Sequence, residues 1–195
     1  MNHNLENYKI YLGYIDKKVA NFFEEQKEYI HCKKGCYTCC TQGNFPVSSI
    51  EAEYIKKGHE QLDETLKKII DDKISKIKKY IKNTRPEFPN HECPFLINNE
   101  CSIYNYRGIK CRTFGLIEIR KESNDKIPFC AFKGLNYSTV ISDDGKTISE
   151  EKFIKLNYKN EPKAYNINYL YLTNEKFEKA LNIEFNNIKP LIEYL

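Results

Sequence analysis

The chain has 195 residues, enough for one large domain or two small ones and for a hydrophobic core of its own, so it needs neither disulfides nor metal merely to fold. Its formal net charge of +4 is only mildly basic and gives no strong case for nucleic acid or an anionic membrane as a partner. No segment approaches the roughly 18 consecutive apolar residues of a membrane span, and the N-terminus lacks a signal-peptide pattern. We therefore expect a cytoplasmic protein.

The N-terminal third is predicted to be helical. From Leu5 to Ile30 apolar residues recur at helical spacing, which indicates one long amphipathic helix, with Gly13 as a point of interruption. Ser48 followed three residues later by Glu51 is a capping-box pattern, so a second helix is expected to begin there and to stop at Gly58.

The middle of the chain changes from helix to loop. Residues 62–81 place isoleucines and leucines on one stripe, which predicts a third helix, and the two prolines in `NTRPEFPN` (residues 83–90) end it. Residues 91–130 have loop-like sequence in which `TFGLIEIRK` (residues 113–121) is a candidate strand. `NYSTVIS`, `DDGK` and `TIS` (residues 136–149) suggest a hairpin because Asp-Gly favours tight turns.

The C-terminal part is predicted to mix short elements. A short helix is expected over residues 150–156, and an extended segment or strand over `YNINYLYLT` (residues 165–173). Asn174 is positioned to cap a helix reaching Phe185, and a last apolar segment covers residues 188–195. The expected fold is mainly α with minor β (α+β), a single domain over residues 1–195. Its irregular cysteine-rich core, about residues 32–130, would pack against amphipathic helices.

Half of the eight cysteines fall within `HCKKGCYTCC`, residues 31–40. The cysteines are Cys32, Cys36, Cys39, Cys40, Cys93, Cys101, Cys111 and Cys130. In a reducing compartment clustered cysteines are more often metal ligands or redox groups than structural disulfides. Disulfides and unligated buried thiols are the two plain alternatives. A close pair of cysteines with further ones returning after a helical insertion makes a plausible cage, and soft thiolates favour zinc, copper(I) or iron–sulfur over magnesium or calcium.

The adjacent pair Cys39 and Cys40 is harder to place on one ion. Adjacent side chains usually diverge, so we do not expect both sulfurs on one tetrahedral zinc. Each could ligate a different metal of a multinuclear site, both could belong to a cluster, or one could be a spare thiol for redox chemistry. Cys130 is the least convincing ligand by its spacing, and Cys32 is intermediate.

Charged and imidazole side chains accompany the cysteines. Arg107 and Arg112 could neutralise thiolates or donate hydrogen bonds to sulfur, or could be solvated surface charges. His31 and His91 lie one and two residues from a cysteine, so either could replace a thiolate on zinc or iron, although a lone histidine is more often a surface residue.

The order of these motifs resembles a known family. `GCYTCC`, `VSSIEAEYI`, `CPFL`, `CSIY` and `YRGIKCRTF` are similar to the YkgJ-like or CxxCxxCC proteins, a family of zinc- or iron-chelating domains, over residues 32–114. The resemblance implies Cys36, Cys39, Cys40, Cys93, Cys101 and Cys111 as metal ligands, with Tyr104, Arg107 and Arg112 as their companions. The chain departs from the family pattern by having Gly108 after Arg107, where the family has proline, and by the longer spacing from Cys32 to Cys36.

Three functions follow as hypotheses. The first is a protein that chelates zinc or iron, the latter including an iron–sulfur cluster. The second is a redox or protein-modifying enzyme that uses such a centre, because flagellin lysine methylases carry a similar cysteine cluster. The third is a zinc-stapled interaction module whose surface helices bind a protein or nucleic acid. No catalytic residues are assigned, since the sequence contains no Rossmann glycine fingerprint, P-loop or H-E-x-x-H motif.

Overall fold

The computed structural model describes residues 3–33, 35–87, 89–120 and 125–195, and it is mainly α-helical with minor β-structure, as predicted. The helices of these ranges are α1 (His3–Glu25), α2 (Ser49–Glu60), α3 (Glu64–Thr84), α4 (Ile109–Thr113), α5 (Glu150–Lys155), α6 (Tyr169–Leu172) and α7 (Glu175–Leu181). The strands pair two by two: β1 (Pro46–Val47) with β6 (Lys189–Pro190), β2 (Leu96–Ile97) with β3 (Glu100–Cys101), and β4 (Ile117–Glu118) with β5 (Ala164–Tyr165). The first two pairs are antiparallel and the third is parallel.

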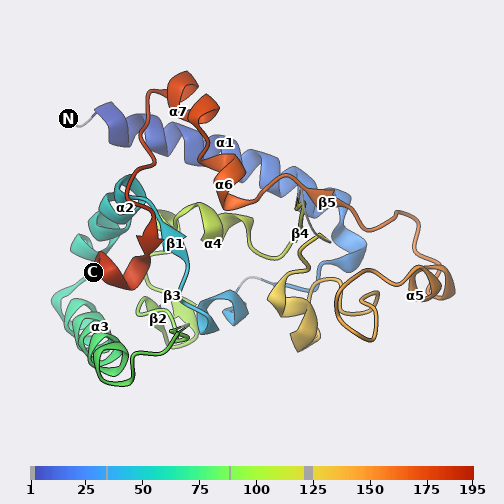
Figure 1. The fold of residues 1–195 in the computed structure, drawn as a ribbon, viewed down its shortest axis with the longest axis horizontal. Helices are drawn as coiled ribbons and strands as arrows, with labels where there is room; N and C mark the ends of the chain where they lie inside the picture. Colours follow the sequence, from blue (N-terminus) through green and yellow to red (C-terminus); the bar gives the residue numbers. More distant parts are fainter. Residues whose placement is uncertain (1–2, 34, 88, 121–124) are drawn as a thin grey trace.

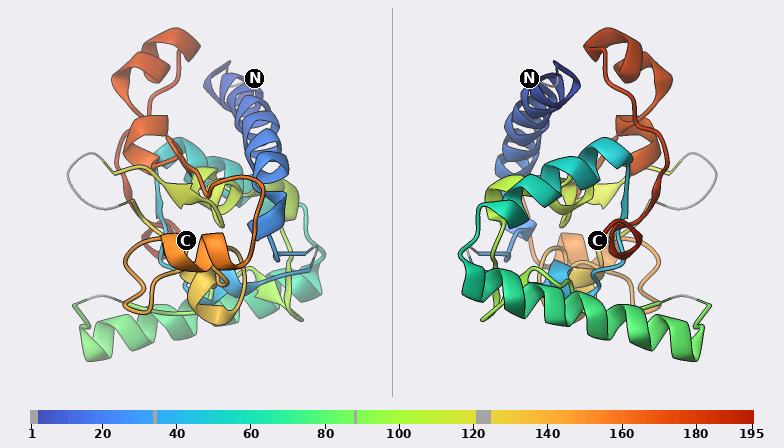
Figure 2. Two further views of the ribbon diagram at one scale, coloured as in Figure 1. Left: turned by 90° about the vertical axis from the view of Figure 1, so that its right-hand side faces the viewer. Right: turned by 90° about the vertical axis from the view of Figure 1, so that its left-hand side faces the viewer.

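The two longest helices of the described ranges, α1 and α3, enclose a region of short helices and loops. α1 and α3 lie on opposite sides of the molecule, with α2 and α4 between them (Figures 1 and 2). α1 packs against α2, α4 and α7, so both ends of the chain contribute to one hydrophobic cluster. Its buried members include Leu5, Tyr8 and Leu12 from α1, and Ile183 and Phe185 from the C-terminal segment. A second cluster packs α3 against the β2–β3 hairpin and the C-terminal residues.

α1 is shorter than the periodicity predicted. It runs through Gly13 without interruption but ends at Glu25, and a 3₁₀ turn, η1 (Lys27–Tyr29), replaces its last expected turn. The helix ends here because of contacts with the C-terminal part of the chain. The fully buried Gln26 side chain accepts a hydrogen bond from the Lys163 N–H at 2.8 Å and donates one to the Glu161 carbonyl oxygen at 3.3 Å. These two hydrogen bonds hold the backbone at Gln26 against the C-terminal segment, so the chain turns away from the helix axis there.

α2 and α3 begin at side-chain caps. The predicted capping box is present, since the Ser48 N–H and hydroxyl both donate to Glu51 at 2.9 Å. α2 continues past Gly58, which lies against the ring of Tyr106 and does not stop the helix. α3 is shifted relative to the predicted 62–81. It begins at Glu64, because Asp63 caps its first turn by accepting a hydrogen bond from the Leu66 N–H at 2.9 Å, and it continues to Thr84.

The β2–β3 hairpin was not predicted from the sequence. Its two-residue loop is Asn98-Asn99, with φ of 49° and 63°. Both values lie in the left-handed region that a type I′ turn requires, and asparagine tolerates that region better than most residues. The `LINNEC` pattern therefore carried a hairpin signal, and this hairpin positions Cys101.

Several expected elements of the second half are different in the structure. The strand predicted over residues 113–121 is reduced to β4, because Thr113 ends α4; its last residue lies outside the described ranges. The predicted hairpin over residues 136–149 has one isolated bridge, between Ile141 and Ile148. Residues 165–173 form the end of β5 and then α6, because the Asn168 side chain caps a helical turn. α7 is capped by Asn174 as predicted, but Asn182 in the left-handed region ends it before Phe185.

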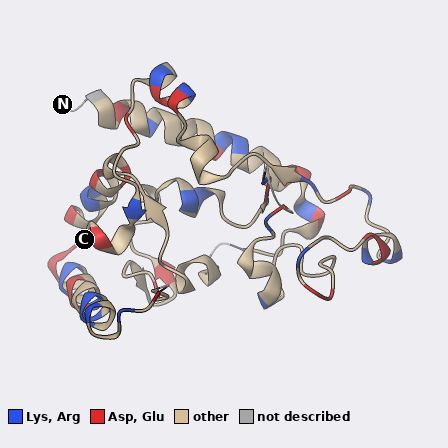
Figure 3. Cartoon of the chain, viewed as in Figure 1, with Lys and Arg blue, Asp and Glu red and all other residues tan. Residues whose placement is uncertain are grey.

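The distribution of charge and the apolar character of the helices bear on whether the protein binds nucleic acid or a membrane. Figure 3 shows Lys and Arg together with Asp and Glu along much of the chain, including α3. None of the helices in the described ranges is both long enough and apolar enough to cross a bilayer.

Candidate metal centre

Cysteines from distant parts of the sequence line two adjoining cavities. The first thiol pocket, of about 410 Å³, is lined by Cys36, Cys39, Cys40, Cys93, Cys101 and Cys111. The second thiol pocket, of about 640 Å³, is lined by Cys32, Cys36, Cys39, Cys111 and Cys130. Cys36, Cys39 and Cys111 border both cavities, which makes them the shared wall. All eight cysteines are free thiols in the structure.

A tight turn positions the cysteines of residues 32–40. The Cys36 N–H donates to the Lys33 carbonyl oxygen at 2.9 Å, and Gly35 has a φ of 89°, which favours glycine. A 3₁₀ helix, η2 (Thr38–Thr41), follows and carries the vicinal pair. The Cys39 and Cys40 sulfurs lie 3.9 Å apart and so do not diverge as expected. Zn–S bonds of about 2.3 Å in a tetrahedron place two sulfurs about 3.8 Å apart, so this spacing fits one tetrahedral edge.

η2 and the residues that follow it are held against the segment that contains Cys93. The Cys93 N–H donates to the Cys40 carbonyl oxygen at 2.8 Å, and the Gly43 N–H donates to the His91 carbonyl oxygen at 2.7 Å. A Cβ atom on Gly43 would lie 2.5 Å from the backbone nitrogen of Cys93. Only glycine allows the two backbones to approach this closely, and the approach brings the two groups of cysteines together.

α4 positions Cys111, and the buried carboxylate of Glu51 positions α4. Glu51 is fully buried; it accepts a hydrogen bond from the Ile109 N–H at 2.9 Å, at the first residue of α4. It also accepts hydrogen bonds from Ser48 and from the Tyr169 hydroxyl. Burial raises the pKa of Glu51, while these donors lower it. Glu51 therefore connects the start of α2, the start of α4 and α6, a role that the capping box alone did not indicate.

Most of the thiols hold their protons tightly because they are buried. Burial raises the pKa of Cys93 to about 12 and raises the pKa of Cys101 and of Cys111. Cys39 is the exception: its hydrogen bond with Cys40 lowers its pKa to about 7, and the positive charge of Arg107 acts in the same direction. The same contact raises the pKa of Cys40. Cys39 is thus the thiol most ready to present a thiolate at neutral pH.

The two expected arginines have different surroundings. Arg107 lines both thiol pockets, and its guanidinium lies 3.6 Å from the centre of the Tyr104 ring, which lines both pockets as well. Arg112 lines only the second thiol pocket of the two. It forms an ion pair with Asp16 of α1 and donates to the carbonyl oxygens of Arg107 and Asn105 at 2.8 and 2.9 Å. Arg107 is therefore placed to offset thiolate charge, whereas Arg112 holds the loop around it.

Cys32 and Cys130 border only the second thiol pocket. Cys32 is exposed as a residue, but partial desolvation of its sulfur and a hydrogen bond with Cys36 raise its pKa to about 12, and burial raises the pKa of Cys130 to about 11. The fully buried Asn136 side chain accepts hydrogen bonds from the His31 and Cys32 N–H groups at 3.0 and 2.8 Å and donates to the Gly115 carbonyl oxygen at 2.9 Å. Sequence reasoning did not single out Asn136, since an isolated asparagine 104 positions from Cys32 carries no local signal.

Among the described residues that line the thiol pockets there is no histidine. His31 is exposed, and the Nδ1 of His91 contacts the Glu92 carbonyl oxygen at 3.0 Å.

The donor set fits a thiolate-bound metal, but not a single preformed ion site. Within residues 3–33, 35–87, 89–120 and 125–195, no three His, Cys, Asp or Glu side chains converge closely enough to hold one ion. Six sulfurs nevertheless surround one cavity, with the cation of Arg107 beside them. Soft donors of this kind suit zinc or iron, and oxygen-preferring metals would find no carboxylate cluster there.

A family model decides the identity of this region. The model, CxxCxxCC, described as “Putative zinc- or iron-chelating domain”, matches residues 31–131, more than half of the chain. The chain belongs to this family. The CxxCxxCC match includes all eight cysteines, η2, the β2–β3 hairpin and α4. Comparison with curated proteins and with solved structures gave no significant match.

Proposed function

We propose that this CxxCxxCC protein binds zinc or iron through thiolates of the first thiol pocket, and that iron, where it is the metal, is held as a polynuclear iron–sulfur cluster. The observation that carries the proposal is six cysteines from three separate segments around one cavity of about 410 Å³. Sulfurs that surround a cavity without converging on one point suit a cluster better than a single ion, which takes four ligands. The cluster, when bound, would supply electron-transfer or Lewis-acid chemistry.

The proposed ligands are Cys36, Cys39, Cys40, Cys93, Cys101 and Cys111, of which Cys36, Cys39 and Cys111 border both pockets. Cys32 and Cys130 line only the second thiol pocket. We propose that they replace another thiolate of the centre or belong to a neighbouring metal site. Arg107 would offset the negative charge that several thiolates leave on the centre, and Tyr104 holds its guanidinium. The redox or protein-modifying enzyme expected as an alternative would use this same centre.

A zinc-stapled interaction module is the second candidate. It is favoured by the 3.9 Å spacing of the Cys39 and Cys40 sulfurs, which fits two ligands on one zinc ion. Either metal needs reduced thiols, and we propose the cytoplasm as the compartment on this ground. We also propose that residues 1–195 fold as one unit, supported by the cluster that joins α1 to the C-terminal segment.

The test is metal analysis of protein purified without oxygen. We expect iron with broad visible absorption if a cluster forms, or colourless protein with stoichiometric zinc if the second candidate is right. C39S and C93S should each lower the metal content, because each removes a sulfur that binds the metal directly, whereas S75A on the exposed face of α3 should not. Equal trace metal in wild type, C39S and C93S would refute metal binding by these residues.

A further inference from the structure

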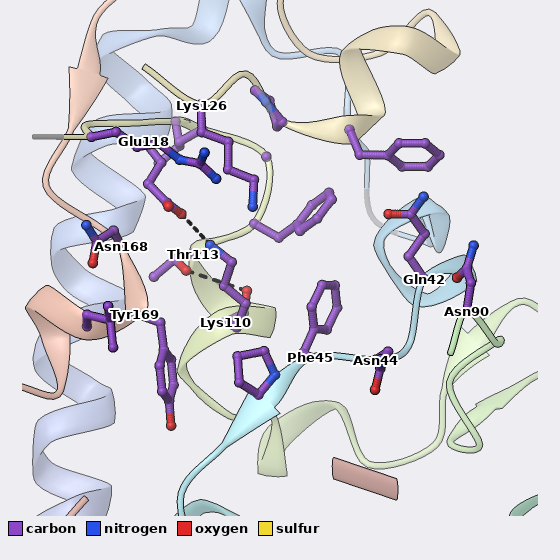
Figure 4. A pocket seen from close by; sticks show the side chains of 18 of the residues that line it. Gln42, Asn44, Phe45, Asn90, Lys110, Thr113, Glu118, Lys126, Asn168 and Tyr169 are labelled. Atoms are coloured by element: carbon purple, nitrogen blue, oxygen red, sulfur yellow. Dashed lines mark hydrogen bonds and ion pairs between the residues drawn. The ribbon is translucent and has the colours of Figure 1, made fainter. Parts of the chain in front are cut away.

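A larger cavity lies on the other side of α4 and contains no cysteine among the described residues that line it. It has a volume of about 740 Å³, within the range of about 300–1,000 Å³ typical of small-molecule sites. Its walls come from the segment before β1, from α4, from the loop around β4 and from α6 (Figure 4). Lys110 faces this cavity, while the next residue, Cys111, faces the thiol pockets.

The lining is positively charged. Lys110, Arg120 and Lys126 contribute three cations and Glu118 one carboxylate, so the described lining residues carry a formal charge of +2. Lys110 pairs with Glu118, and the two side chains are only 15% and 12% exposed. Glu118, the acidic residue among the described lining residues, is therefore already paired with Lys110. Lys126 has no ion-pair partner among the residues that the structure describes.

The position of Lys126 favours binding of an anion other than the Glu118 carboxylate. Figure 4 shows its side chain reaching into the cavity above Lys110. Its backbone is fixed by two hydrogen bonds with the backbone of Glu118, at 2.8 and 3.0 Å. Partial desolvation and the nearby charges of Lys110 and Arg120 lower the pKa of Lys126, while the Glu118 carboxylate acts in the opposite direction. The Asp125 carboxylate accepts a hydrogen bond from the Arg120 N–H at 3.3 Å but does not line the cavity.

Aromatic rings also line the cavity. Phe45 and Phe114 lie with ring centres 5.9 Å apart and planes inclined by 53°, and Phe129 and Tyr169 also line the cavity. Rings of this kind bind flat apolar groups through dispersion and stacking. Because cations and aromatic rings line the same cavity, the cavity is amphipathic.

We propose that this cavity binds a small organic anion in which a phosphate or carboxylate group is joined to a flat apolar body. The anionic group would lie between Lys126, Lys110 and Arg120, where charge-assisted hydrogen bonds are strong. The apolar body would lie against the rings of Phe45, Phe114 and Phe129. The cavity shares no cysteine with the thiol pockets, although Phe114 and Gly115 line both this cavity and the second thiol pocket.

Binding is tested with three probes of similar size by ligand-observed NMR and calorimetry on the full chain. Phenyl phosphate and benzoate represent the two sources of the anionic group, and benzyl alcohol is the neutral control. We expect at least one anion to bind about tenfold or more tightly than benzyl alcohol. The tighter of the two anions identifies the source. Equal binding of all three probes, or binding of none, would overturn the proposal.

Two variants with opposite expected signs separate a local effect from loss of folding. K126Q should weaken binding of the preferred anion about tenfold, because one charged donor is lost. E118Q should tighten it, because the competing carboxylate becomes neutral while the side chain keeps its shape. K79Q, on the exposed face of α3, should bind as the wild type does. Unchanged affinity in K126Q, or equal loss in K126Q and K79Q, would contradict the assignment; metal content of the same samples is measured separately.

Discussion

The Cys93 N–H donates a hydrogen bond to the Cys40 carbonyl oxygen at 2.8 Å, and this contact joins two cysteine segments that lie 53 positions apart in the sequence. The backbones meet at Gly43, two residues after the end of η2, where no side chain intervenes. The candidate centre therefore depends on main-chain geometry as much as on the thiols themselves.

G43A should separate the two segments. The new Cβ would lie 2.5 Å from the Cys93 nitrogen and 2.6 Å from its Cα, so the backbones must move apart. We expect a loss of about 1–3 kcal/mol in the free energy of unfolding, as for other overpacked sites, together with lower metal content. Urea unfolding and elemental analysis measure both effects.

G13A is the matched control for that substitution. Gly13 lies in α1, and a methyl group added to it would have no neighbouring atom within 4 Å, so alanine meets no clash. Alanine in an exposed helix should stabilise the protein by about 0.5–1 kcal/mol and leave the metal content unchanged. If both variants lose metal equally, the close approach at Gly43 is not what holds the centre together.

E51Q should destabilise the protein and loosen α4. The amide can replace only one carboxylate oxygen as an acceptor, so one of the Ser48 and Ile109 N–H groups loses its partner in a fully buried site. The expected cost is about 1–3 kcal/mol. E60Q, exposed on the same helix, should be neutral, and chemical unfolding of the two variants decides whether Glu51 has this role.

R107Q should weaken metal retention. The guanidinium lines both thiol pockets and helps to lower the pKa of Cys39, so its removal leaves thiolate charge less compensated. Loss of such a supporting group typically costs about 10- to 100-fold in metal affinity. Chelator competition measures the change, with R85Q at the exposed end of α3 as control. Retention equal to wild type would show that Arg107 does not act on the centre.

Metal affinity should rise with pH. Burial raises the pKa of Cys93 to about 12, so this thiol is protonated at neutral pH and must lose its proton to become a ligand. Each thiolate formed by metal binding releases a proton, and competition from protons decreases as pH increases. Zinc titrations at about pH 6 and about pH 8, with a pH indicator in weak buffer, should show proton release and tighter binding at the higher pH. Affinity independent of pH would exclude buried thiols as the ligands.

Local patterns were sufficient for the long helices and for the family to which the cysteine motifs belong. The apolar stripes of α1 and α3, and the capping residues Ser48 and Asn174, depend on neighbours within a few positions, which the sequence displays directly. The motif order around the cysteines pointed to the family that the family model confirms. Helix ends were less predictable, because the end of α1 depends on hydrogen bonds between Gln26 and residues 161 and 163.

The amino-acid sequence by itself determined that this is a mainly helical chain with soft sulfur donors in the order of the CxxCxxCC family. Only the tertiary structure decided which cysteines share a cavity, how close Cys39 lies to Cys40, and that Glu51 supports the helix carrying Cys111. It also revealed the cationic cavity behind α4, whose lining comes from segments far apart in sequence. The physical reason is that hydrophobic periodicity and capping act over one or two turns, whereas cavities and buried hydrogen bonds arise from contacts between distant segments.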